Sequence, residues 1–303
     1  MFAGACLVAH VPAAVSPAVA AAAGFQALAA PQRLLDTRPG EHTADSAWEG
    51  GGALAAGDTL ELPVAGRVGL PSDPTAVMLN VTVTGAGGHG FVTVYPCGRR
   101  PTASTVNYTP GQTVPNAVIA TVSAQGTVCF YSYAATHLVV DVSGWFPEGS
   151  YRPLAAPQRV LDTRPGQPTA DGDGAGTGLR PAMSVTSVPV AGRVGLPDDA
   201  ESVVVNVTVT EPDAAGFVTV FPCGAEPPNA SNVNYTPGAT VPNMAVSKVG
   251  VGGAVCLYTY AAAHLIVDVS GSLPAATFVP LATPQRLLDT RGGTVSATVD
   301  GRF

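Results

Sequence analysis

The chain has 303 residues, of which 46% are hydrophobic and 12% are charged, and its formal net charge at pH 7 is -7. This apolar content excludes a disordered chain, and the length predicts about two domains. Lys248 is the single lysine and there is no basic cluster that could neutralise a row of phosphates, so we do not expect a nucleic-acid partner.

The composition also indicates the class of secondary structure. Glycine and proline are abundant, with 35 and 28 residues, and the periodic stretches are rich in valine and threonine. This balance favours many short strands separated by turns, because glycine and proline suit turns while β-branched residues suit strands. We therefore expect an all-β protein.

Residues 1–26 form an Ala-rich segment with almost no charge. His10, Pro12 and Pro17 interrupt its apolar run, so it is too broken for a membrane-spanning helix. The segment is similar to a signal peptide, and Ala18–Ala20 offers the small residues that a signal peptidase accepts, although a basic start is missing. We expect a secreted protein, with an Ala-rich linker as the alternative interpretation.

The main feature of the sequence is an internal repeat. The segment Pro31–Arg38 returns as Pro157–Arg164 and again as Pro284–Arg291. Further motifs recur in the same order, with these starts: Val-Ala-Gly-Arg-Val-Gly-Leu-Pro at Val64 and Val190, Asn-Val-Thr-Val-Thr at Asn80 and Asn206, Gly-Phe-Val-Thr-Val at Gly90 and Gly216, and Val-Asn-Tyr-Thr-Pro-Gly at Val106 and Val233. A unit of this length is a full domain, unlike the units of about 20–50 residues that build solenoids.

The repeats predict two complete domains, residues 27–150 and 151–279, and the start of a truncated third repeat at residues 280–303. A segment as short as the third unit does not bury a core of its own. We expect the chain to be a fragment of a longer array, the alternative being that this tail docks on the second domain.

Within each unit, apolar residues alternate with more polar ones. Val77, Leu79, Val81 and Val83 form an apolar face, and valines at positions 203, 205, 207 and 209 repeat it. Further strands are expected at 59–64, 91–95, 117–123, 127–133 and 137–142. Seven or eight short antiparallel strands per unit predict tandem β-sandwich domains of a jelly-roll-like kind.

Each complete unit holds one pair of cysteines. Cys97 and Cys129 lie in the first unit, and Cys223 and Cys256 lie in the second. We expect one disulfide per domain, each contributing on the order of 3 kcal/mol. A zinc site is the rival interpretation, but two thiols without a second nearby Cys or His pair fall short of four ligands.

The charged residues do not assemble into a recognisable catalytic set. His137 and His264 each precede an aspartate by four positions, which in a strand places the two side chains about 13 Å apart and excludes a direct dyad. The run Asp171–Gly174 resembles half of a calcium loop, but Ala182 stands where a bidentate glutamate is needed. We therefore expect no catalytic residue, no metal and no cofactor.

Repeated Asp and Arg residues predict structural ion pairs. The expected participants are Asp36 with Arg38, Asp162 with Arg164, and the recurring Asp141 and Asp268. An arginine would clamp an aspartate of its own or of the neighbouring strand, since planar bidentate pairing suits partly buried arginine. Ligand recognition by these residues is the alternative.

Recurring tyrosines are the candidates for a binding surface, because an exposed ring offers an apolar face for stacking on a sugar. Tyr131 and Tyr133 recur as Tyr258 and Tyr260, but they share a strand face with the cysteines, so we expect them to pack in the core or at its rim. Tyr108 and Tyr235, each in an Asn-Tyr-Thr-Pro-Gly turn, are the alternative exposed rings.

Three motifs carry a resemblance to a known family: Arg33–Arg38, Asn80–Pro96 and Val140–Phe146. Over residues 27–303 the chain resembles the tandem extracellular repeats of actinobacterial and acidobacterial secreted proteins, although Ser272 and Leu273 replace the closing aromatic pair in the second unit. The resemblance implies cell-surface or cell-wall-associated modules that accompany hydrolase domains in longer chains. It implies no catalytic residues and no particular ligand.

These observations favour a non-catalytic, secreted module for adhesion or surface attachment, with cell-wall or other extracellular polysaccharide, or a surface protein, as partner. Two weak sites on one chain would bind a repetitive surface through high effective concentration. The alternatives are a structural spacer without a ligand and an accessory part of an extracellular hydrolase.

Overall fold

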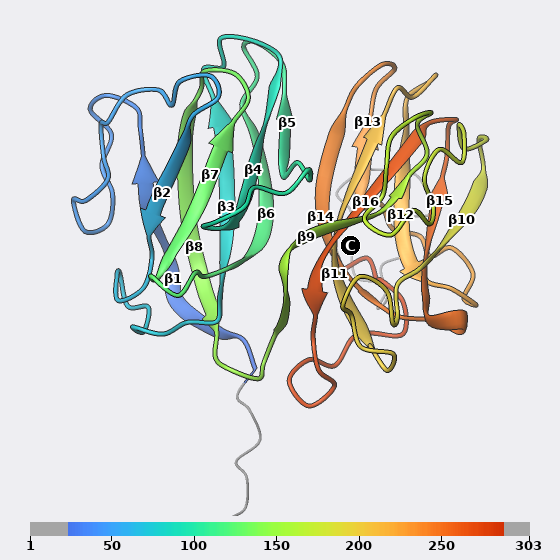
Figure 1. Cartoon of the computed structure of the whole chain (residues 1–303). Helices are drawn as coiled ribbons and strands as arrows, with labels where there is room; N and C mark the ends of the chain where they lie inside the picture. The colour runs from blue at the N-terminus through green and yellow to red at the C-terminus, as the bar shows by residue number, and fades with distance from the viewer. Residues whose placement is uncertain (1–23, 288–303) are drawn as a thin grey trace, which may run out of the picture.

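A computed structural model describes residues 24–287 as two all-β domains (Figure 1). Most of the segment expected to be a signal peptide and most of the truncated third repeat lie outside these residues. Within residues 24–287 no helix has the length and hydropathy needed to cross a membrane.

Domain 1 consists of strands β1 to β8. Their bounds are β1 Gln26–Asp36, β2 Thr59–Pro63, β3 Ala76–Thr84, β4 Gly90–Pro96, β5 Val106–Tyr108, β6 Val114–Thr121, β7 Thr127–Ser132 and β8 His137–Phe146. They form two four-stranded antiparallel sheets with the orders β1-β8-β3-β6 and β2-β7-β4-β5. This is the strand order of a jelly roll, in which paired strands fold over into two facing sheets.

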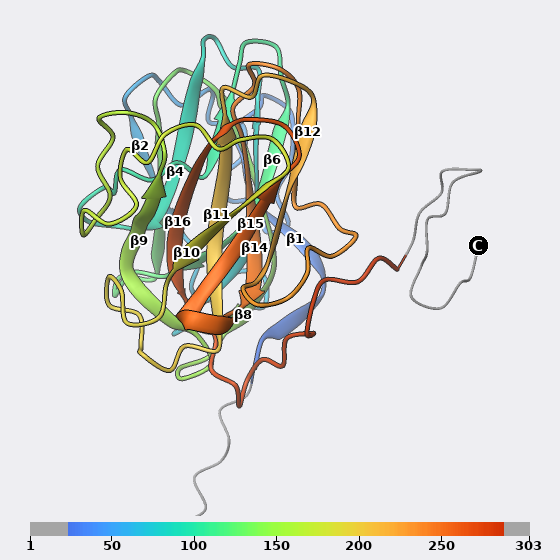
Figure 2. The same ribbon diagram turned by 90° about the vertical axis from the view of Figure 1, so that its right-hand side faces the viewer.

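Domain 2 repeats the same topology. Its strands are β9 Arg152–Asp162, β10 Ser184–Pro189, β11 Ser202–Thr210, β12 Gly216–Pro222, β13 Val233–Tyr235, β14 Val241–Lys248, β15 Ala254–Thr259 and β16 His264–Ser272, with a short 3-10 turn at Val251–Gly253. The sheet orders are β14-β11-β16-β9 and β10-β15-β12-β13. The expected all-β class, tandem sandwich architecture and jelly-roll-like fold are therefore confirmed. Figure 2 shows the molecule from the side of domain 2, with domain 1 behind it.

The core of each domain lies between its two sheets. In β3 the residues Val77, Leu79, Val81 and Val83 are buried in the domain 1 core, and the matching valines of β11 are buried in domain 2. The partner sheet supplies alternate residues too, such as Val128 and Phe130 of β7. Since side chains of a strand point alternately to the two faces, burying one set turns the other set outward.

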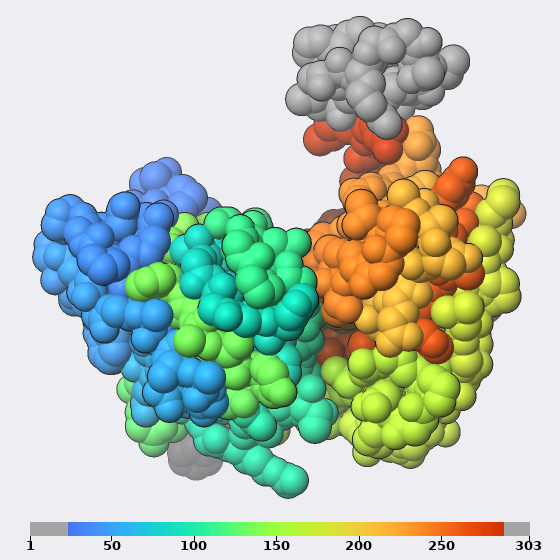
Figure 3. All heavy atoms as spheres, turned by 90° about the horizontal axis from the view of Figure 1, so that it is seen from above, coloured from blue at the N-terminus to red at the C-terminus, as the bar shows by residue number. Residues whose placement is uncertain are grey.

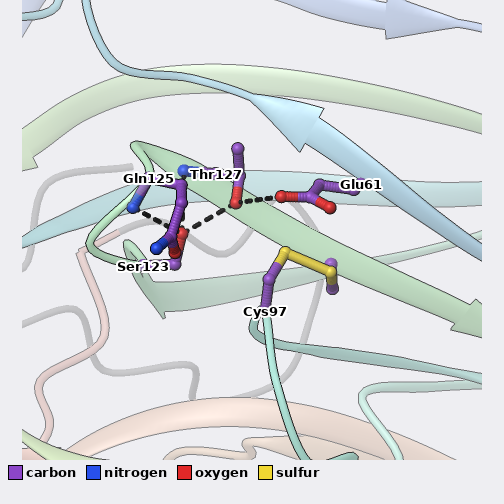
Figure 4. Close-up of a disulfide and its surroundings, with 6 residues drawn as sticks. Glu61, Cys97, Ser123, Gln125 and Thr127 are labelled. Atoms are coloured by element: carbon purple, nitrogen blue, oxygen red, sulfur yellow. Dashed lines mark hydrogen bonds between the residues drawn. A yellow bond between two sulfur atoms is a disulfide. The ribbon is translucent and has the colours of Figure 1, made fainter.

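One disulfide staples each domain, which confirms the expectation from the sequence. Cys97 bonds to Cys129 with a Cα–Cα distance of 5.0 Å, and Cys223 bonds to Cys256 with 4.9 Å. Each bridge ties the segment after β4 or β12 to the neighbouring strand on the outer face of the sheet. Figure 4 shows the first bridge beside Glu61, whose carboxylate accepts a hydrogen bond from Thr127 (2.8 Å). Because the two sulfurs are bonded to each other, Cys97 and Cys129 have no thiolate to offer a metal.

The two domains meet through a hydrogen-bonded asparagine junction. Asn116 Nδ2, in β6, donates to Asn206 Oδ1 of β11 (2.9 Å), and the backbone N–H of Met244 in β14 donates to Asn116 Oδ1 (3.1 Å). Asn206 Nδ2 in turn donates to the carbonyl of Ser104 (2.8 Å). The outer face of one sheet of domain 2 is thereby fixed against the β5–β6 edge of domain 1.

An apolar cluster supports this junction. Ile119 of domain 1 and Val204 of domain 2 are buried in it, and Tyr151, in the connection before β9, is buried beside Phe146. Gly271 is required here, because a Cβ at this position would lie 2.6 Å from the Tyr151 hydroxyl. The residues after β16 stay close to the boundary, where Thr277 Oγ1 donates to the Ser150 carbonyl (3.0 Å).

The junction predicts different effects for two asparagines at equivalent repeat positions. Asn206→Ala removes hydrogen bonds that join the domains, so we expect a loss of about 1–3 kcal/mol in the free energy of unfolding. Asn80→Ala is the matched control, because Asn80 is exposed and its side chain, among residues 24–287, bonds only to Thr82 of its own strand; its expected effect is within about 0.5 kcal/mol. Urea unfolding measures both, and equal losses would contradict the assigned role of Asn206.

The hydroxyl of Tyr151 is buried without a hydrogen-bond partner among the described residues. The equivalent repeat positions hold Phe25 and Phe278. Tyr151→Phe removes an unsatisfied polar group at little change in shape, so we expect it to stabilise the protein by about 1 kcal/mol. Tyr108→Phe is the control and should destabilise, because the Tyr108 hydroxyl bonds to Ser132 and to the Ala134 carbonyl. A lower melting temperature for Tyr151→Phe would contradict this assignment.

Candidate functional site

An aromatic cluster lies on the outer face of the sheet β2-β7-β4-β5 in domain 1. The ring of Phe91 in β4 stacks on Tyr133, just after β7, with a centroid distance of 5.2 Å and an interplanar angle of 21°. Tyr131 of β7 also contacts Phe91, at a centroid distance of 6.0 Å and a tilt of 46°. Tyr133 is 57% exposed, so this stacked pair presents a ring face to solvent.

Domain 2 carries the same cluster at the equivalent positions. Phe217 stacks on Tyr260 at 5.3 Å and 21°, and it contacts Tyr258 at 5.9 Å and 48°. Tyr260 is 50% exposed. In both domains the backbone N–H of the exposed tyrosine donates to the carbonyl of the phenylalanine (3.0 Å), which holds the two rings side by side.

The expectation that the four recurring strand tyrosines pack in the core or at its rim is wrong for Tyr133 and Tyr260, which are exposed. Val128, Phe130 and Ser132 take the core side of β7, so the disulfide at Cys129 and both tyrosines take the outer side. The rings at positions 131 and 258 are half-buried beside the disulfides, whereas those at 133 and 260 are exposed. The tyrosines and the cysteines do share one strand face, as the sequence predicts, but this face is the outer one.

The opposite correction applies to Tyr108 and Tyr235, which are buried and not the exposed rings that were expected. Each lies in a three-residue strand, β5 or β13, that pairs with the start of β4 or β12 and points the ring into the core. The Tyr235 hydroxyl bonds to Thr259 Oγ1 (3.0 Å), just as Tyr108 bonds to Ser132. Gly90 is needed opposite, since a Cβ there would lie 2.8 Å from the Tyr108 hydroxyl.

The domain 1 cluster carries a cation that the domain 2 cluster lacks. The guanidinium carbon of Arg100 lies 3.6 Å from the centroid of the Tyr131 ring, which is a cation–π contact. The two repeats differ in the loop that follows their Pro-Cys-Gly motif, where domain 1 has Arg99 and Arg100 and domain 2 has Ala225 and Glu226.

A groove runs along the boundary between the domains and begins at the domain 1 cluster. Three adjoining hollows of about 550, 460 and 640 Å³ form it. The first and second share Phe91, Asn107 and Thr240, and the second and third share Thr102 and Arg159. The surface is visibly hollowed where the two domains meet (Figure 3).

The charged residues of the opening motif form an ion-pair network in domain 1. Arg38 Nη2 lies 2.7 Å from Asp36 Oδ2, and Arg33 bonds both to Asp36 (3.0 Å) and to Asp141 (2.9 Å). Asp141 is thus paired with Arg33, which sequence reasoning did not assign to an ion pair. The signal was present, because Arg33 opens the repeated motif.

Domain 2 has the same network in a more buried setting. Arg159 bonds to Asp162 and Asp268 (both 3.0 Å), and Arg164 bonds to Asp162 (2.7 Å). The side chains of Arg159 and Asp268 are 11% and 2% exposed, compared with 34% and 27% for the equivalent Arg33 and Asp141. Burial raises the pKa of Asp268, although the charge and hydrogen bond of Arg159 oppose this.

The remaining polar candidates are engaged in local structure. His137 Nδ1 bonds to Thr37 Oγ1 (3.0 Å) and His264 Nδ1 bonds to Thr163 Oγ1 (2.9 Å). Asp171 of the calcium-like run is held by Arg193 (2.8 Å), as Asp45 is held by Arg67 (2.9 Å) in domain 1. These carboxylates lock a loop of each domain.

Neither a comparison with protein-family models nor one with curated proteins found a match. Among solved structures, the chain is similar to the N-terminal CBM22-1-CBM22-2 tandem domain of Xyn10C from Paenibacillus barcinonensis, with 12% sequence identity and a TM-score of 0.23. The match covers 85% of this chain and 100% of that chain. A likeness at this TM-score carries no functional conclusion.

The ion pairs Asp45–Arg67 and Asp171–Arg193, which we call the loop locks, predict a pH-dependent contribution to stability. Hydrogen bonds from Arg67 lower the pKa of Asp45 below its ordinary value of 3.8, with burial opposing them. A lowered pKa in the folded state stabilises the protein above the ordinary aspartate pKa, and this contribution is lost as the pH falls through the folded value.

We therefore expect Asp45→Asn to destabilise the protein at neutral pH and to have a shrinking effect as the pH drops below the aspartate range. Urea unfolding at neutral and acidic pH measures the difference from wild type. Asp73→Asn, at an exposed position, is the control and should change stability little at either pH. A deficit of Asp45→Asn that stays constant with pH would argue against the ion pair as its cause.

Proposed function

We propose that this chain is a non-catalytic extracellular module that binds polysaccharide through its two exposed aromatic clusters. The observation that carries the proposal is the stacked pair in each domain, Phe91 with Tyr133 and Phe217 with Tyr260. A half-exposed tyrosine that is fixed by a second ring offers a preorganised apolar face, on which the C–H face of a sugar stacks.

The duplication of the cluster supports binding to a repetitive polymer or surface. Each cluster combines a phenylalanine on a strand with a tyrosine directly after the neighbouring strand, and the asparagine junction ties the two domains together. When one cluster is occupied, the second is held close to the same polymer at a high effective concentration. Two weak sites are then sufficient for firm attachment to a cell wall or another insoluble polysaccharide.

The disulfides support an extracellular setting, because such bonds persist in oxidising compartments and are rare in the cytosol. The resemblance to tandem extracellular repeats of actinobacterial and acidobacterial secreted proteins supports a surface location in the same way. In this proposal the module attaches the protein that contains it to a cell surface or cell wall, and any hydrolase activity resides in other domains of that protein.

A structural spacer without a ligand is the second candidate function. The side-by-side junction around Asn116 and Asn206 favours it, because this contact produces a stiff unit that needs no ligand to hold its shape. The two candidates differ in one respect that is easily measured, which is retention on an insoluble polymer.

The test is a pull-down of the full chain on insoluble peptidoglycan, chitin, cellulose and whole bacterial cells. We expect retention on at least one matrix, and a decrease of roughly tenfold for Tyr133→Ala/Tyr260→Ala, because both stacking faces are lost. Trp48→Ala is the control, since it removes a similarly exposed ring elsewhere on domain 1 and should bind as wild type does. No retention on any matrix would favour the spacer, and retention that the tyrosine variant leaves unchanged would exclude the aromatic clusters as the binding site.

A further inference from the structure

We infer that the groove between the two domains binds an acidic polysaccharide, with sugar rings stacked at Phe91 and Tyr133 and the anionic groups facing Arg99 and Arg100. This inference rests on the proposed function and adds the class of ligand and a second element of the site. Both domains line the groove, so it would be a property of the tandem and of neither domain alone.

The lining of the groove is the first observation. In a chain of net charge -7, the three hollows contain four arginines, Arg99, Arg100, Arg159 and Arg164, and no aspartate or glutamate. Carboxylates elsewhere on the surface repel an anion, whereas this strip attracts one. Repulsion by the negative surface and attraction by the arginines of the groove together guide an acidic polymer to the domain boundary.

Only part of this positive charge is neutralised within the protein. Arg159 and Arg164 are held by Asp162 and Asp268. No ion pair among residues 24–287 involves Arg99 or Arg100, and the guanidinium carbon of Arg100 instead lies over the Tyr131 ring. A guanidinium that stacks on a ring keeps its N–H edge available, which is the edge that binds a carboxylate or phosphate in a bidentate manner.

The shape of the groove fits an extended chain. Its first hollow lies between the Phe91–Tyr133 pair and the residues Gly238–Pro242 of domain 2. The middle hollow is lined by hydroxyl and amide groups, including Asn107, Gln167 and Thr240, which suit hydrogen bonding to sugar hydroxyls. The third hollow, beyond Thr102, is the one that Arg99 and Arg100 line.

Single-stranded nucleic acid also combines stacking with negative charge, but the groove favours a sugar polymer. Nucleic-acid grooves neutralise successive phosphates with a continuous row of basic residues. Here two arginines without carboxylate partners lie at one end of the groove, and hydroxyl and amide groups line its middle. This distribution matches a polysaccharide with spaced anionic groups.

The experiment measures the affinity of the full chain for soluble polymers by affinity electrophoresis and calorimetry. The polymers are polygalacturonate as a uronate chain, a phosphate-bearing teichoic acid, neutral xylan and glucan, and single-stranded DNA. We expect an acidic polysaccharide to bind most tightly and to weaken as salt rises from about 0.02 M to about 0.3 M. The uronate and teichoic-acid arms tell which anion the groove prefers.

The variants separate this inference from the proposed function. Arg99→Gln/Arg100→Gln should weaken acidic polysaccharide binding by roughly tenfold, because charge-assisted hydrogen bonds are lost, while leaving neutral polymers unaffected. Arg152→Gln/Lys248→Gln removes as much positive charge from exposed positions outside the groove and is the matched control, with an expected change below about twofold.

Three outcomes would overturn the inference in distinguishable ways. Preference for a neutral polymer, with no effect of Arg99→Gln/Arg100→Gln, would exclude an acidic ligand but would remain consistent with a polysaccharide-binding module that uses its aromatic clusters. Binding of single-stranded DNA as tightly as acidic polysaccharide would show that the class of ligand is wrong. Failure to bind any soluble or insoluble polysaccharide would remove the proposed function together with this inference.

Discussion

The burial of alternate side chains between two facing sheets is the constraint on which the rest of this structure depends. Rows of valine in β3 and β11 are removed from water, at about 25 cal/mol for each Å² of apolar surface, and this burial fixes the strand register. A shift by one residue would turn the core-facing side chains of the strand to its outer face. The same alternation turns Cys129, Tyr131 and Tyr133 to the outside, so the placement of the aromatic cluster is a consequence of core packing.

The asparagine junction converts two such domains into one unit. Asn116 satisfies an N–H group on the free edge of β14 and the amide of Asn206, so polar groups that would lose water at the boundary gain partners. Docking also covers the Arg159–Asp268 pair, whose counterpart in domain 1 remains partly exposed. The groove lies along this contact, and residues of both domains line it.

The two repeats share a scaffold but differ where function is proposed. Both keep the disulfide, the stacked Phe and Tyr pair and the loop lock, which are set by local packing within one domain. Domain 1 alone has Arg99 and Arg100 next to the boundary, and domain 2 has Ala225 and Glu226 instead. Each repeat therefore contributes differently to the groove, as expected if the pair functions as one binding unit.

The sequence alone determined the all-β class, the tandem arrangement, the jelly-roll-like sandwich and both disulfides, because period-two alternation, a domain-length repeat and paired cysteines are local signals. It did not reveal β1, where two register shifts break the alternation, or β5, which has three residues. It misplaced the tyrosines, because period two assigns residues to a common face without telling which face is covered. Only the tertiary structure decided that Tyr108 is buried and Tyr133 exposed, that Arg33 pairs with Asp141, and that a groove lies between the domains. These features arise from contacts between segments distant in the sequence, and no local pattern encodes which segments meet.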